Sequence, residues 1–237
     1  MTANAAVADA TDRAGRRVLR CRACDLLYVD PRPAAGPSGL RTDAVMRAAR
    51  GLPVGTRALA AACGPDWEGD LPRGWDIDLG AMECAPPAVY GAVVFAGTLE
   101  RCPDPAGALA RAGSALRPGG RVIVRADNAD GAASRLLAGR YWAGYAFPAR
   151  SQYFTPATLR ATAARAGLRV ERLVVRPDGR AWTSAVGHRR ADVGAPANRN
   201  GSGRPPGRVA DALGTLVDVA AALAGRGGRI DATLCVS

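Results

Sequence analysis

The segment from about residue 88 to residue 128 most strongly constrains the fold, because it alternates strand and helix signals. A short apolar run, VYGAVVFAG, precedes PDPAGALARAGSAL, in which Asp104 can cap a helix and Pro105 can occupy its first position. The residues RPGG break this helix and turn the chain, and the apolar run RVIVRAD follows. Strands that alternate with helices of this length predict an α/β sheet with helices on both faces.

The same signals recur elsewhere along the chain. Thr155 and Pro156 begin a helix that Gly167 ends, and LRVERLVV then alternates as a strand should. TRALAAAC, at residues 56–63, is the first candidate for a buried strand. The expected division is a flexible arm over 1–20, a Cys-x-x-Cys segment and helix over 21–55, a core over 56–190, a Gly/Pro-rich loop over 191–208, and a helix and strand over 209–237 that complete the core.

The charge is strongly positive, at +11, but it does not favour nucleic-acid binding. All 32 basic residues are arginine, and they are scattered rather than gathered on one stripe. The first twenty residues lack the apolar stretch of a secretion signal, and no apolar run approaches the length of a membrane span. The six cysteines have irregular spacing, which is typical of reduced thiols in a chain of this size. We therefore expect a cytoplasmic protein with no membrane partner.

Three stretches of the chain carry a family resemblance. YGAVVFAGTLERCPDPAGALARAGSALRPGGRVIVRADN, at 90–128, resembles the second half of a class I S-adenosylmethionine-dependent methyltransferase. YWAGYAFPARSQYF and the helix start after it resemble the small-molecule branch of that family, and CRACDLLYVDPRP resembles the N-terminal segment of some members. The resemblance implies a Rossmann-like sandwich whose sheet is mostly parallel with an antiparallel C-terminal strand. It also implies methyl transfer from S-adenosylmethionine to a small molecule.

The cofactor contacts that the resemblance implies are reduced in this sequence. An intact unit has a glycine loop, a helix N-terminus and an acidic residue about 20 positions further on. The stretch PDWEGDLPRGWD contains too many prolines and glycines for such a helix. A second alignment equates GWDIDLGAMECAPPAVYGAVV with the third and fourth strands, so that the second strand and its ribose-binding acid are missing and Ala81 replaces an adenine-binding Asp. We expect a sheet that lacks an early strand and helix, and an eroded site whose remaining cofactor contacts are Cys63, Gly64, Glu83 and Ala96.

The acid–base residues of the resembled family are also changed. Arg101 follows the Glu where relatives have a histidine, and Arg150 and Tyr153 stand where relatives have two histidines. Arginine remains protonated and cannot act as a base. Glu100 and Tyr153 are therefore the candidate catalytic residues. The candidate substrate-binding residues are Arg101, Tyr141, Trp142 and Arg150, and Asp127 and Asn128 end a strand on the side where ligands bind in open sheets.

Several alternatives stay open from the sequence. Cys21 and Cys24 have the spacing of zinc ligands, but a closed site needs four ligands and no second half is evident, so we expect no metal. The aromatic-rich stretch around Trp142 fits either a substrate pocket or a core filling. The function is methyl transfer to a small molecule, a repurposed cyclisation or isomerisation, or the role of an inactive pseudoenzyme. The last would form a homo- or hetero-oligomer with a homologue.

Overall fold

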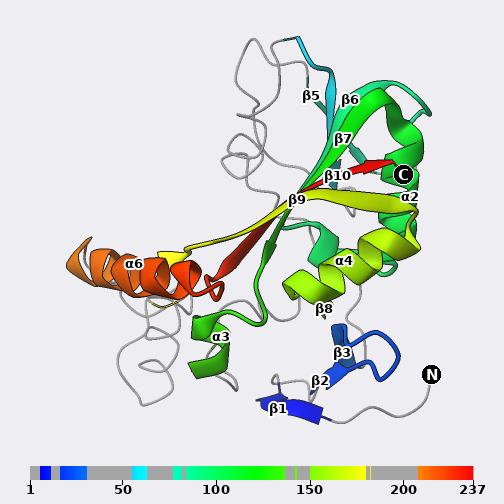
Figure 1. Ribbon diagram of the computed structural model, residues 1–237. Coiled ribbons are helices and arrows are strands. Elements are labelled where there is room, and N and C mark those ends of the chain that lie inside the picture. Colours follow the sequence, from blue (N-terminus) through cyan, green and yellow to red (C-terminus); the bar gives the residue numbers. More distant parts are fainter. Residues whose placement is uncertain are drawn as a thin grey trace, which may run out of the picture.

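The computed structural model describes residues 6–11, 17–30, 55–62, 77–81, 84–136, 142, 150–179, 182 and 208–236. Two sheets are present, and helices lie beside the larger one (Figure 1). In spatial order the larger sheet contains β5 (Ile77–Ala81), β4 (Ala58–Ala62), β6 (Tyr90–Ala96), β7 (Leu116–Asp127), β10 (Arg229–Val236) and β9 (Leu168–Arg176). The smaller sheet contains β1 (Ala6–Thr11), β2 (Arg17–Arg20), β3 (Leu27–Asp30) and β8 (Gln152–Tyr153).

The strand directions confirm the predicted fold class. β5, β4, β6 and β7 are parallel neighbours, whereas β10 is antiparallel to both β7 and β9. Central parallel strands are buried on both faces, and β6 accordingly has five consecutive buried residues from Ala92 to Ala96. The helical elements in the described part of the chain are η2 (Leu99–Arg101), α2 (Pro105–Ala115), α3 (Ala132–Leu136), α4 (Pro156–Arg165) and α6 (Arg208–Leu223).

The two helices that follow proline begin where the sequence predicts. Asp104 caps α2 by accepting a hydrogen bond from the Gly107 N–H at 3.0 Å, with Pro105 in the first turn. A reciprocal capping box between Thr155 and Thr158 begins α4. Both helices pack against the sheet in one core, whose largest fully buried apolar side chains are Phe95, Phe154, Leu99, Leu109, Leu159, Ile230 and Leu234.

The RPGG residues do more than end α2. Strand β7 already begins at Leu116, which pairs with Tyr90, and regular pairing resumes between Ala92 and Arg121. The register therefore shifts across these residues, and Gly119 has a φ of +77°, a conformation that favours glycine. The expected turn is thus an irregular first part of the strand.

The N-terminal part differs from the expected flexible arm. Residues 6–11 and 17–20 form β1 and β2, which pair antiparallel, and β3 pairs with β2 on one side and with β8 on the other. Strand β8 comes from a distant part of the chain, so local sequence patterns could not reveal this pairing. The side chains of this sheet meet those of α3 in a second core cluster: Val18, Leu27, Val29, Ala133, Trp142 and Tyr153.

Among the described residues, β5 is the one strand beyond β4 in the larger sheet, as expected for a sheet that lacks an early strand. Strand β5 pairs directly with β4, with Ala58 opposite Ile77 and Ala62 opposite Ala81. The residues aligned with a third strand therefore occupy the position next to the first parallel strand. The helix expected at 42–51, the loop 191–208 and the stretch 63–76 lie outside the described residues.

The long helix α6 lies at the far end of the sheet from α2, beside α3 and β9 (Figure 1). Its Asp218 is fully buried and accepts hydrogen bonds from the backbone N–H groups of Asp178 and Gly228 and from the Trp182 indole N–H. One carboxylate therefore holds the helix to the chain that leaves β9 and to the chain that enters β10. Among the helices in the described ranges, none combines the length and the apolar character needed to cross a membrane.

Candidate functional site

The strand order places a topological switch point at the carboxyl ends of β4 and β6. Strand β4 has β5 on one side and β6 on the other, so connections leave it in opposite directions, and ligands bind at such a point in open α/β sheets. The residues after β6 reach across this point, since the Thr98 hydroxyl donates to the Ala61 carbonyl oxygen at 2.8 Å. Gly97 has a φ of +81°, and a Cβ added there would meet nothing within 4 Å. The chain therefore leaves open space beside the end of β6.

Glu100 is the central ionisable group at this edge. It lies on η2, and only 1% of its surface is exposed. Its Oε1 accepts a hydrogen bond from the Asp127 backbone N–H at 3.2 Å, which joins the ends of β6 and β7. Its Oε2 is buried and has no hydrogen-bond partner among the described residues. Burial raises the pKa of Glu100, and the nearby Asp127 adds to this effect, whereas Arg150 opposes it.

Arg150 and Asp127 form an ion pair next to Glu100. Their side chains keep 16% and 30% of their surface exposed. The chain after Arg150 is fixed to η2, because the Ser151 N–H donates to the Glu100 carbonyl oxygen at 2.9 Å. Burial acts to lower the pKa of Arg150, but Asp127 and Glu100 together hold it above its ordinary value. The guanidinium is therefore a permanent cation between two carboxyl groups.

Arg101 lies on the same short helix as Glu100 and is partly buried. Burial lowers its pKa, and the neighbouring Arg150 lowers it further, while Glu100 opposes both. The structure thus brings the candidates Glu100, Arg101 and Arg150 together with Asp127, which ends strand β7.

The aromatic candidates have a different environment. Trp142 is 3% exposed and packs against Tyr153, with ring centroids 5.9 Å apart. Tyr153 is 1% exposed and pairs with Leu27 within the smaller sheet. These two rings therefore fill the second core cluster, which favours the core-filling interpretation for them. Tyr141 lies outside the described residues.

The candidate cofactor residues are only partly described. Ala96 is the buried last residue of β6, directly before Gly97. Cys63, Gly64 and Glu83 lie outside the described residues. In sequence, however, Glu83 comes two positions after β5, the strand that pairs with β4.

Two further residues near this edge differ from what the sequence analysis expects. Cys102 is disulfide-bonded, which corrects the expectation that all cysteines are reduced, whereas Cys21, Cys24, Cys84 and Cys235 are free. Gln152 is fully buried, and its Nε2 donates to the Cys102 and Pro103 carbonyl oxygens. Sequence reasoning missed Gln152 because a glutamine between a serine and a tyrosine gives no signal of burial.

Three solved structures are among those to which the chain is similar. An S-adenosylmethionine-dependent methyltransferase from Thermotoga maritima has 16% identity and a TM-score of 0.47, with 84% of this chain and 90% of that chain covered. Another from Mesorhizobium loti has 15% identity and a TM-score of 0.45, with 82% and 99% covered. The [4+2]-cyclase SpnF has 15% identity and a TM-score of 0.45, with 83% and 81% covered. No curated protein matches the chain.

A family model provides the decisive comparison. The model described as a methyltransferase domain matches residues 18–173, which is well over half of the chain. The match extends from the smaller sheet through β9, and it includes both strands whose ends carry Glu100 and Asp127. The chain therefore belongs to the class I S-adenosylmethionine-dependent methyltransferase family.

Proposed function

We propose that this protein transfers a methyl group from S-adenosylmethionine to a small molecule, and that Glu100 accepts the proton which the methyl acceptor loses. The observation that supports Glu100 most directly is its Oε2 atom, which is buried without a hydrogen-bond partner among the described residues. A buried polar atom in this condition costs about 1–3 kcal/mol, and native proteins contain few of them. Its position at the ligand-binding edge of the sheet favours a ligand as the missing partner.

The electrostatics of the site suit this role. Burial raises the pKa of Glu100, so its carboxylate form is a stronger base than an exposed glutamate. The Arg150 guanidinium stays charged beside it and can stabilise the carboxylate when the proton leaves. Tyr153 is the weaker candidate, because its ring is packed between Trp142 and the smaller sheet.

The end of strand β6 is suited to binding the methyl donor, S-adenosylmethionine. The cofactor of a βαβ unit needs backbone that it can approach closely, and Gly97 provides open space immediately after Ala96. We propose that Ala96 and Gly97, together with Cys63, Gly64 and Glu83, hold S-adenosylmethionine. When bound, it supplies an electrophilic methyl group. Glu83 follows the strand beside β4, and this is the place where an acidic residue binds ribose hydroxyls in such units.

The methyl acceptor is proposed to lie over the Arg150–Asp127 pair. Both side chains are partly exposed there, so Arg150 can donate to a carboxylate or enolate oxygen of the acceptor, and Asp127 can accept from its hydroxyl group. Arg101 adds a second positive charge on the same side of Glu100. This arrangement favours a small acidic or hydroxylated acceptor. The cell compartment we propose remains the cytoplasm.

The test combines cofactor binding with turnover. Titration calorimetry with S-adenosylmethionine should give saturable binding to the wild-type chain, to Glu100→Gln and to the matched control Glu171→Gln, whose carboxylate is exposed and ion-paired with Arg121. Release of S-adenosylhomocysteine with a panel of phenols and hydroxy acids should fall about 10²- to 10⁴-fold in Glu100→Gln and remain unchanged in Glu171→Gln.

Three other outcomes would contradict the proposal. Absence of S-adenosylmethionine binding, together with saturable binding of an apolar metabolite, would favour the cyclase or isomerase alternative. Absence of binding together with co-purification of a homologue would favour the pseudoenzyme alternative. Turnover that is equal in the wild type and in Glu100→Gln would refute the role of Glu100 alone.

A further inference from the structure

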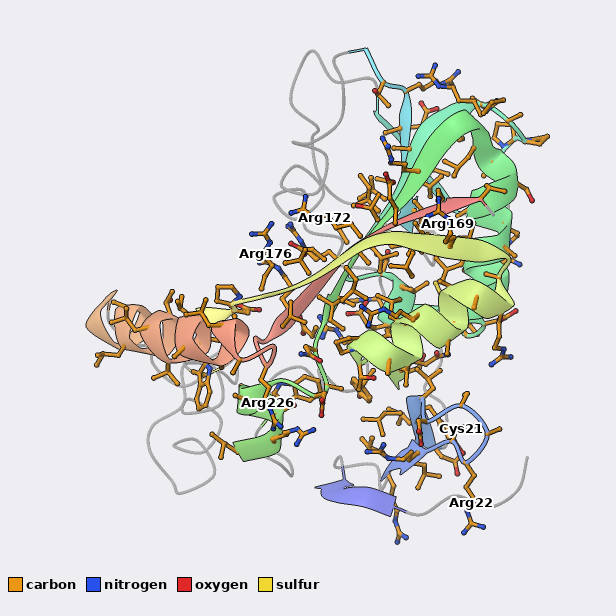
Figure 2. The ribbon with its side chains drawn as sticks, in the orientation of Figure 1. Cys21, Arg22, Arg169, Arg172, Arg176 and Arg226 are labelled. Carbon is orange, nitrogen blue, oxygen red and sulfur yellow. The ribbon has the colours of Figure 1, made fainter. Side chains whose placement is uncertain are left out.

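A pocket of about 590 Å³ lies between the Cys-x-x-Cys turn and the start of α2, apart from the edge that carries Glu100. Its walls are the turn at 21–24, strand β3, residues 103–106 before and in the first turn of α2, Gln152 of β8, and Thr162 and Arg165 of α4. Figure 2 shows Cys21 on the turn between β2 and β3, below α4. The free thiols of Cys21 and Cys24 thus line a cavity between the smaller sheet and the helices α2 and α4.

The backbone of this turn favours one of the two thiols as a nucleophile. The turn is closed by hydrogen bonds from the Asp25 N–H to the Cys21 carbonyl oxygen and from the Cys21 N–H to the Leu26 carbonyl oxygen, both 2.9 Å. The backbone of Ala23 and both the side chain and the backbone of Cys24 lie close enough to stabilise the thiolate form of Cys21. These contacts lower the pKa of Cys21, and Arg165 contributes, although burial opposes them.

The pocket also contains a polar group that requires a partner. Gln152 is 1% exposed, and its Nε2 donates to the carbonyl oxygens of Cys102 at 3.0 Å and Pro103 at 3.1 Å, which fixes the orientation of the amide. Its Oε1 is buried and has no hydrogen-bond partner among the described residues. A ligand with an N–H or O–H group would satisfy this acceptor. Arg165, which also lines the pocket, would attract a carboxylate.

We propose that Cys21 and Cys24 are a redox-active dithiol, and that this pocket binds their oxidant, a low-molecular-weight peptide disulfide that carries carboxylate and amide groups. The Cys21 thiolate attacks one sulfur of the oxidant, the oxidant's S–S bond breaks, and one thiol leaves after taking up a proton. Cys24 releases its proton to solvent and attacks the Cys21 sulfur, which displaces the second thiol. Two protein thiols are thereby oxidised to one disulfide, and one small disulfide is reduced to two thiols.

A metal site is the competing explanation of the Cys-x-x-Cys spacing. A closed structural zinc site requires four ligands. In the part of the chain that the structure describes, no group of three or more His, Cys, Asp or Glu residues could hold a metal ion. The pocket beside the thiols and the unsatisfied Gln152 oxygen have no role in such a site, whereas the dithiol proposal uses both.

The first test follows the oxidation by glutathione disulfide of the chain in which Cys21 and Cys24 are thiols and the Cys102 disulfide is intact, with intact mass and peptide mapping after alkylation. The wild type should lose two hydrogen atoms and give a linked Cys21–Cys24 peptide. Cys24→Ser should stop at a mixed disulfide on Cys21. The matched controls Cys84→Ser and Cys235→Ser, which change free thiols outside the pocket, should oxidise at the wild-type rate.

The second test examines the pocket. Glutathione disulfide should oxidise the wild type faster than the uncharged hydroxyethyl disulfide, and Arg165→Gln should reduce this preference about tenfold, as expected for one charge-assisted hydrogen bond. Equal rates with both disulfides in the wild type would overturn the assignment of the pocket. Stoichiometric Zn²⁺ binding that protects both thiols from alkylation would overturn the redox assignment, as would oxidation of Cys84 at the rate of Cys21.

Discussion

Replacing Glu100 by glutamine should remove a pH dependence of stability that the wild-type protein carries. Burial raises the pKa of Glu100 above its ordinary value of 4.5, so the folded protein holds a proton that the unfolded chain releases in the window between the two values. The stability that the protonated carboxyl contributes is fully present at pH values below the ordinary pKa. It is lost as the pH rises through the pKa that Glu100 has in the folded protein. Within that window the free energy of unfolding falls by about 1.4 kcal/mol per pH unit.

Glutamine reproduces the shape of the protonated side chain. Its Oε1 can still accept from the Asp127 N–H, and its Nε2 replaces the carboxyl O–H. Relative to the wild type, the free energy of unfolding of Glu100→Gln should therefore rise with pH across the window, with a slope of about 1.4 kcal/mol per pH unit. Together with the turnover test, this predicts a variant that is more stable and less active than the wild type near neutral pH.

The measurement is urea unfolding of the wild type and the variant at a series of pH values that begins near the ordinary pKa of glutamate. Glu171→Gln is the control, because Arg121 lowers the pKa of this exposed carboxyl, so any stability it contributes is lost as pH falls. The difference in free energy of unfolding between Glu171→Gln and the wild type should therefore not grow as pH rises. A difference for Glu100→Gln that stays constant with pH would mean that the folded and unfolded chains titrate this carboxyl alike, which would refute the reasoning.

Three further variants test the packing that positions the site. Asp218→Ala should lower the free energy of unfolding by about 3 kcal/mol or more in urea unfolding, because three buried or partly buried N–H groups lose their acceptor. Leu109→Ala removes a fully buried side chain of α2 and should cost about 2–5 kcal/mol by the same measurement, and a cost below 1 kcal/mol would contradict the core assignment. Thr155→Ala removes the cap of α4 and should cost about 1 kcal/mol, whereas Thr215→Ala, within α6, changes no helix cap and serves as the comparison.

Local signals in the sequence predicted much of the sheet and its helices. The helix starts at Asp104–Pro105 and Thr155–Pro156 are local, because their capping hydrogen bonds join residues only a few positions apart. These helix starts therefore form whatever the rest of the fold is. The apolar run of β6 is equally local, because a central parallel strand needs apolar residues on both faces.

Features that depend on distant partners could not be predicted in the same way. The place of β5 beside β4 is decided by pairing across the sheet, which local sequence patterns do not show. The burial of Glu100 depends on Ser151 and Asp127, which approach it from other elements. The sequence identified Glu100, Arg101 and Arg150 by analogy with histidine-bearing relatives, but it could not show that a free carboxyl oxygen is buried beside them.

The pairing of β3 with β8 has a consequence for protein synthesis. Strands β1, β2 and β3 leave the ribosome before the larger sheet, but Gln152 and Tyr153 leave it only after the parallel strands β4, β5, β6 and β7 have been made. The apolar face formed by Val18, Leu27 and Val29 therefore stays uncovered by Tyr153 until that residue has been synthesised. The segment with β2 and β3 therefore exposes apolar side chains during synthesis until β8 has been made.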